Sequence, residues 1–146
     1  MVPDLEQKLK THTFVLMMTS KILGHNDVKP LITIGLAGCT AVVVISRYND
    51  YATMYHCDPC LYTIENVVVN KGDIVYVKTP GEYHKFDDKY VFIVAQQAIK
   101  NQIAMWVKQS GRMHIRAYDM YMSIGEPAIN RQMLIKSVDK EFIVTW

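Results

Sequence analysis

Two short runs of apolar, mostly β-branched residues lie on either side of a glycine-rich turn, and this pattern constrains the fold more than any other. The runs are Leu31–Ile34 and Ala41–Ile45, and the turn between them is Gly35–Gly38. β-Branched side chains pack well on a pleated surface, and runs this short and this apolar indicate strands that are buried on both faces. The sequence therefore predicts two core strands that are joined by small residues.

The segment after the second run predicts a hairpin that returns toward this turn. Arg47–Asp50 has the composition of a turn, so we expect Tyr51–His56 to run back antiparallel to the second run. Because a strand rises about 3.3 Å per residue, the outward and return paths nearly cancel. His56 would then lie near Cys39, seventeen residues earlier, and Thr33 enters the same turn six residues before Cys39. Three polar side chains are predicted to converge.

The rest of the chain indicates further strands and one clear amphipathic helix. Apolar residues recur at helical spacing at Ile99, Ile103, Trp106 and Val107, and the helix should end near Gly111. A short helix is predicted over residues 4–10, whereas residues 14–18 fit a strand or a helix equally. Residues 79–82 have loop composition. Strands are predicted at Leu61–Val69, Ile74–Val77, Tyr90–Val94, His114–Tyr118, Gln132–Lys136 and Phe142–Thr145. Leu61–Val69 and Ile74–Val77 would pair as a second hairpin.

Together these elements predict a single domain spanning residues 1–146. The expected fold class is α+β, with a mostly antiparallel, sandwich-like sheet core and one or two flanking helices. A length of 146 residues suffices for one proper core. No internal repeat or linker interrupts the pattern.

Charge and composition exclude several classes of function. The net charge of +2 is too small to favour nucleic acid or an anionic membrane as a partner. The apolar runs are too short to span a bilayer, and we expect no cleavable targeting segment at the N-terminus. The chain has three cysteines, an odd number, which favours free thiols in a reducing, cytoplasmic compartment.

A thiol on a small-residue turn with a histidine nearby can form a nucleophile and its base. In this interpretation Cys39 is the nucleophile, His56 activates it, and Thr33 orients the imidazole by a hydrogen bond. Main-chain N–H groups of the turn would stabilise an oxyanion. The oxyanion and substrate loop comprises Gly35, Leu36, Ala37, Gly38 and Thr40. The alternative is that Cys39 is simply a small buried residue of a β core.

These residues resemble a known family of enzymes. Thr33, Cys39 and His56, in this order and at this spacing, resemble the Thr, Cys and His constellation of CheD, the bacterial chemoreceptor glutamine deamidase. Leu36-Ala-Gly-Cys39-Thr40 and Tyr55-His56 are also similar to motifs of the cytotoxic necrotizing factor catalytic domain, which deamidates a glutamine in Rho GTPases. The resemblance covers residues 30–58.

The resemblance implies a protein-glutamine deamidase with a sandwich-like fold and no cofactor. Cys39 would attack the side-chain carboxamide of a glutamine in a target protein, and His56 would activate the thiol and protonate the departing ammonia. Thr33 would hold His56, and water would hydrolyse the thioester to leave glutamate. Such an enzyme would act in the bacterial cytosol or, as a delivered toxin or effector, in the cytosol of a host cell.

The sequence departs from that family after His56. Cys57-Asp-Pro-Cys60 is a CxxC motif, which leaves open a metal site formed by Cys39, His56, Cys57 and Cys60, a redox pair, or two incidental thiols. Two further alternatives remain open. One is a related thiol enzyme, such as a transglutaminase or a protease, and the other is a non-catalytic protein- or metal-binding module.

Overall fold

The computed structural model describes residues 7, 10–36, 38–58, 64–86, 89–94, 97–119 and 131–146. Its strands form two sheets. The smaller sheet has the order β1-β3-β9-β10, formed by β1 (Thr13–Phe14), β3 (Leu31–Thr33), β9 (Met133–Val138) and β10 (Glu141–Thr145). The larger sheet has the order β2-β5-β4-β6-β7, with β8 paired to β6. Its strands are β2 (Thr19–Gly24), β4 (Thr40–Ile45), β5 (Tyr51–Cys57), β6 (Ile74–Phe86), β7 (Lys89–Val94) and β8 (Arg112–Asp119).

Besides residues 7, 10 and 11, which are helical, the described part of the chain contains the α-helix α2 (Gln97–Gln109) and the 3-10 helix η1 (Ile64–Asn66). Among the described strand pairs only β1 with β3 and β6 with β8 are parallel. The predicted α+β class, with a sandwich-like and mostly antiparallel core, is therefore confirmed. The predicted helix over residues 4–10 lies mostly outside the described residues. No helix in the described part of the chain is long and apolar enough to cross a membrane.

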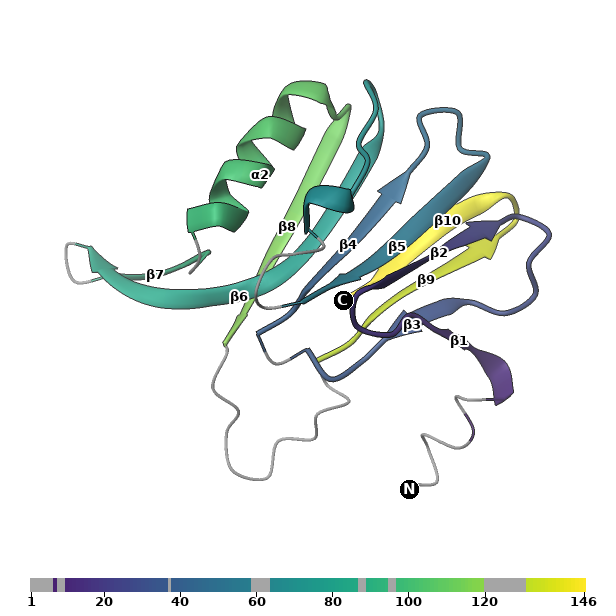
Figure 1. Ribbon diagram of the computed structural model, residues 1–146, viewed down its shortest axis with the longest axis horizontal. Coiled ribbons are helices and arrows are strands. Elements are labelled where there is room, and N and C mark those ends of the chain that lie inside the picture. The colour runs from purple at the N-terminus through teal and green to yellow at the C-terminus, as the bar shows by residue number, and fades with distance from the viewer. Residues whose placement is uncertain are drawn as a thin grey trace.

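The larger sheet separates two apolar cores, and β4 contributes to both. Ala41, Val43 and Ile45 point into the core between the two sheets, whereas Val42 and Val44 point into the core beneath α2. This explains why the run shows no alternation of polar and apolar residues. Burying each valine or isoleucine contributes roughly 1.5–3 kcal/mol. Figure 1 shows α2 on one side of the larger sheet and the smaller sheet on the other.

Helix α2 covers the second core much as its spacing predicts. Ile99, Ile103 and Trp106 are buried, but Val107 is 55% exposed because it lies at the margin of the apolar stripe. The chain turns at Gly111, whose N–H donates to Asp73 O at 2.8 Å. A Cβ atom at Gly111 would lie 2.8 Å from Gly72 O, so this close approach of two main-chain segments requires glycine.

The predicted second hairpin is wrong. Residues 61–63 lie outside the described residues, and the described part of Leu61–Val69 contains η1 and irregular backbone, not a strand. Val67 and Val69 pack into the core beneath α2, and both edges of the first half of β6 are already occupied by β4 and β8. Apolar content alone did not distinguish this packing from a strand.

The predicted loop at residues 79–82 is also wrong, because β6 continues through it to Phe86. Pro80 lacks an N–H and normally interrupts a strand ladder. Here it stands between Lys78, the last residue paired with β4, and Gly81, the first paired with β7. A proline is tolerated here because this is where the strand beside β6 changes from β4 to β7.

The chain crosses from the smaller sheet to the larger one twice at the same edge. Residues 15–18 join β1 to β2, and residues 34–39 join β3 to β4. The end of β5 lies at this edge as well, because Thr19 pairs with His56 and Thr40 pairs with Cys57. Both crossings and the C-terminal end of β5 therefore surround one place in the fold (Figure 1).

Candidate active site

Thr33 and His56 meet in a buried hydrogen-bond network that joins the two sheets. Thr33 Oγ1 lies 2.6 Å from His56 Nδ1, and the Thr33 hydroxyl also donates to Val15 O at 3.0 Å. His56 Nδ1 lies 3.3 Å from the same carbonyl. Thr33 belongs to β3, His56 to β5, and Val15 begins the first crossing. The structure thus brings together two of the three residues that the sequence singles out.

This network assigns the imidazole tautomer. A carbonyl oxygen can only accept, so the Thr33 hydroxyl proton is directed at Val15 O and Nδ1–H of His56 donates toward Thr33 Oγ1 and Val15 O. Nε2 then carries a lone pair and no proton. It is buried and has no hydrogen-bond partner among the described residues. An unsatisfied buried nitrogen is uncommon in folded proteins, and a catalytic role is one of the explanations for it.

Cys39 lies on the same face of the larger sheet as His56. Ala41 pairs directly with His56 across β4 and β5, and both Cys39 and Ala41 point into the core between the sheets. Cys39 lies one residue before β4, which begins at Thr40, so it stands next to the end of this ladder. Cys39 and His56 are therefore placed at the same end of the larger sheet.

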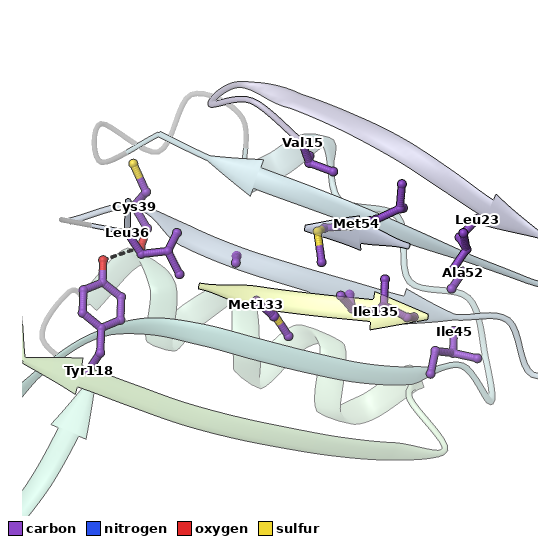
Figure 2. Packing of buried hydrophobic residues seen from close by; sticks show 13 residues of the cluster. Val15, Leu23, Leu36, Cys39, Ile45, Ala52, Met54, Tyr118, Met133 and Ile135 are labelled. Atoms are coloured by element: carbon purple, nitrogen blue, oxygen red, sulfur yellow. Dashed lines mark hydrogen bonds between the residues drawn. The ribbon is translucent and has the colours of Figure 1, made fainter. Parts of the chain in front are cut away.

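In this structure the Cys39 thiol points at a methionine and not at the histidine. Its Sγ lies 3.6 Å from Sδ of Met17, a residue of the first crossing, and Cys39 is only 6% exposed. Figure 2 shows the sulfur at one end of the core cluster, directed away from Met133 and Ile135. The thiol is covered, and no hydrogen bond joins it to Nε2 of His56.

The electrostatics of the pair favour its neutral form. Burial raises the pKa of the Cys39 thiol above its usual value, and the Asp58 carboxylate adds to the increase. Burial also lowers the pKa of His56, with a partial offset from its hydrogen bond to the Val15 carbonyl. A histidine beside a cysteine favours the ionised thiol, and burial of both groups opposes this effect here.

Two main-chain donors of the predicted oxyanion loop are already engaged. Leu36 N–H donates to Arg131 O at 3.1 Å, and Gly38 N–H donates to Tyr118 Oη at 2.8 Å. The positive φ angles of Gly35 and Gly38, 68° and 103°, explain why the turn contains glycine at these positions.

The two other members of that loop lie elsewhere. Thr40 points to the opposite face of β4, where its hydroxyl lies 2.8 Å from Thr79 Oγ1. Ala37 lies outside the described residues. The turn presents Cys39, but its freely available donors are fewer than the sequence predicts.

Sequence reasoning missed two residues that hold this turn, Tyr118 and Arg131. Tyr118 Oη accepts from Gly38 N–H and donates to Cys39 O at 2.7 Å. Arg131 lies over the Tyr118 ring, with 5.4 Å from its guanidinium carbon to the ring centroid. Both residues are about eighty or more positions from the turn along the chain, so no local motif could have indicated them.

A buried lysine lies in the same row as His56. Lys78 pairs with Ala41 on the side of β4 opposite His56, and it is 5% exposed. Burial and, to a smaller extent, the charges of Arg116 and Arg131 lower the pKa of Lys78 to about 8. Its amine donates to the main-chain oxygens of Gln132 and Trp146. These bonds tie the smaller sheet to the larger one beside the site, so the amine acts as a structural link.

Cys57 does not join the other site residues. It points into the core beneath α2, on the face of β5 opposite to that of His56. Cys60 lies outside the described residues. In the part of the chain that the structure describes, no group of three or more potential ligands is arranged to hold a metal ion. Cys39 and Cys57 thus belong to different cores, on the two sides of the larger sheet.

Comparison of the chain with protein-family models gave no match, and comparison with curated proteins gave none either.

Proposed function

We propose that this protein is a cysteine-dependent protein-glutamine deamidase with a CheD-like fold. The observation that carries the proposal is the hydrogen bond between Thr33 and His56, because it directs Nδ1–H away from the thiol and leaves Nε2 as a free, buried base on the face where Cys39 lies. In enzymes with a thiol or hydroxyl nucleophile, a third group commonly orients the histidine that acts as the base.

The proposed reaction begins with both groups neutral. When the glutamine side chain enters, it displaces Met17, and the Cys39 thiol turns toward His56. The Sγ proton moves to Nε2 while the sulfur attacks the carboxamide carbon. The resulting imidazolium then gives this proton to the departing nitrogen, so ammonia leaves and a thioester remains. A water molecule, deprotonated by Nε2, hydrolyses the thioester to glutamate and restores the thiol.

The developing oxyanion needs a donor that the resting turn has not already used. Leu36 N–H and Gly38 N–H are engaged, but Cys39 N–H precedes the start of both ladders of β4, which begin at Thr40 with β5 and at Ala41 with β6. The N–H of a nucleophile commonly contributes to an oxyanion hole. We assign this role to Cys39 N–H.

The proposed substrate is a glutamine on the surface of a protein, and the proposed compartment is the cytosol of a bacterium or, for a delivered toxin or effector, of a host cell. The two cysteines in the described residues are free, which suits a reducing compartment. The chemistry just described requires no cofactor.

The proposal is tested with an acetylated glutamine peptide in which a diazomethyl ketone replaces the side-chain amide. Attack by a nucleophilic thiol releases dinitrogen and leaves the peptide on the sulfur as a thioether. We expect selective modification of Cys39, mapped by peptide mass spectrometry, and loss of the modification in His56→Ala. Cys57→Ser is the matched control and should react as the wild type does.

The asparagine homologue of the reagent, whose side chain is one methylene shorter, tests whether the site selects the length of a glutamine side chain. Modification of Cys39 at equal rates by both reagents, or at an unchanged rate in His56→Ala, would contradict the proposal.

A further inference from the structure

The Tyr118 hydroxyl contacts the nucleophile turn through two hydrogen bonds. It accepts from Gly38 N–H at 2.8 Å and donates to Cys39 O at 2.7 Å. These two main-chain atoms lie on either side of the peptide group that joins Gly38 to Cys39. The Tyr118 side chain therefore holds the main chain on both sides of that peptide group. Figure 2 shows the Tyr118 ring beside Leu36 and its hydroxyl at the Cys39 main chain.

Burial makes these bonds important for the conformation of the turn. Tyr118 is 8% exposed and Cys39 is 6% exposed, so a main-chain group that lost its partner here would not readily find water. A buried donor or acceptor without a partner costs free energy, and the chain avoids that cost by rearranging. Gly38 has a φ angle of 103°, in a region that glycine leaves easily. Without the hydroxyl, the turn would therefore adopt other conformations.

Arg131 holds the tyrosine and the other end of the same turn. Its guanidinium lies over the Tyr118 ring, its Nη1 donates to Leu36 O at 3.4 Å, and its own carbonyl accepts from Leu36 N–H at 3.1 Å. Arg131 is 4% exposed. Arg131 thus holds the Tyr118 ring and the Leu36 end of the turn in place together.

We propose that Tyr118 is a positioning residue for Cys39, which fixes the main chain of the nucleophile turn so that the thiol can be used together with His56. This inference rests on the proposed function. It goes beyond that function by assigning a role to Tyr118, which lies 79 positions from Cys39 along the chain and binds the main chain of the turn, not the thiol or the imidazole.

The test is a double-mutant cycle on the rate of Cys39 alkylation by iodoacetamide at pH 7, mapped by peptide mass spectrometry. The cycle uses the wild type, Tyr118→Phe, His56→Ala and the double variant. Tyr118→Phe keeps the ring beneath Arg131 and removes only the hydroxyl. Tyr76→Phe is the matched control, because Tyr76 packs against the same core and stacks on His114. Thermal unfolding of each variant establishes that it folds.

We expect Tyr118→Phe to slow alkylation by about ten- to a hundredfold, the loss that a misplacement of about 1 Å produces. Tyr76→Phe should not change the rate. Adding His56→Ala to Tyr118→Phe should cause little further loss, because a misplaced thiol no longer uses the base. Hydrogen exchange in a peptide that contains Gly38 should be faster in Tyr118→Phe than in Tyr76→Phe.

Two results would overturn the inference in distinguishable ways. If His56→Ala slows alkylation but Tyr118→Phe does not, or if the two losses multiply, Tyr118 has only a structural role and the proposed function stands. If His56→Ala does not affect the rate in the wild-type background, His56 is not the base, and the positioning role and the proposed function both fail.

Discussion

Thr33 Oγ1 and His56 Nδ1 lie 2.6 Å apart, although one residue is in the smaller sheet and the other in the larger. The bond therefore depends on the packing of the two sheets as well as on local chain geometry. It gives the imidazole one orientation, in which Nδ1 carries the proton and Nε2 is free. The proposed chemistry depends on this orientation more than on any other contact.

Removing the Thr33 hydroxyl should release the imidazole from this orientation. Thr33→Val keeps the shape but removes the hydroxyl, which leaves Nδ1–H of His56 only its longer contact of 3.3 Å with Val15 O. We expect a loss of about 1–3 kcal/mol in the free energy of unfolding and loss of His56-dependent modification of Cys39 by the diazomethyl ketone peptide. Thr33→Ser keeps the hydroxyl and should retain the modification. Nitrogen NMR shifts of His56 should show one tautomer in Thr33→Ser and a mixture in Thr33→Val; a single tautomer in both would contradict the assigned orientation.

Met17 should limit access to the nucleophile. Its Sδ lies 3.6 Å from Cys39 Sγ, so Met17→Ala should speed alkylation of Cys39 severalfold. Met18→Ala is a matched control, since Met17 and Met18 are 52% and 53% exposed and the sulfur beside Cys39 Sγ is that of Met17. Both substitutions should change the free energy of unfolding by no more than about 0.5 kcal/mol. Equal rates of Cys39 alkylation in the two variants would show that Met17 does not cover the thiol.

The buried imidazole should make the protein less stable in mild acid. Because burial lowers the pKa of His56 in the folded state, the unfolded chain binds a proton below about pH 6.5 that the folded chain does not. The free energy of unfolding should therefore fall as the pH falls below this value, and His56 should have no such effect above it. Urea unfolding from pH 7.5 to 5 should show a smaller decrease for His56→Gln than for the wild type. Parallel curves would mean that His56 is protonated equally well in both states.

The strands around the site could be predicted because their sequence signals are local. Leu31–Ile34 and Ala41–Ile45 are apolar enough to define β3 and β4, and the turn composition of Arg47–Asp50 predicts the return of β5. The register of that hairpin follows from its length. Once Ala41 is opposite His56, Cys39 must lie near the histidine.

The remainder of the site depends on contacts that have no local signal. Tyr118 reaches Cys39 only because β8 pairs in parallel with β6, a pairing that the predicted second hairpin would have excluded. The direction of the Cys39 pKa also requires the structure, because spacing places a base beside the thiol but does not indicate how deeply the thiol is buried. Met17 covers the thiol from a crossing whose conformation the sequence left open.

The most direct test of the central claim is whether this protein converts glutamine to glutamate in other proteins. Purified wild type, Cys39→Ser and Cys57→Ser would be incubated with bacterial and with eukaryotic cell lysates, and glutamine-to-glutamate mass changes would be mapped across all peptides. We predict conversion at a few specific glutamines with the wild type and with Cys57→Ser, and none above background with Cys39→Ser. Absence of conversion by the wild type in both lysates, or conversion that persists in Cys39→Ser, would contradict the account.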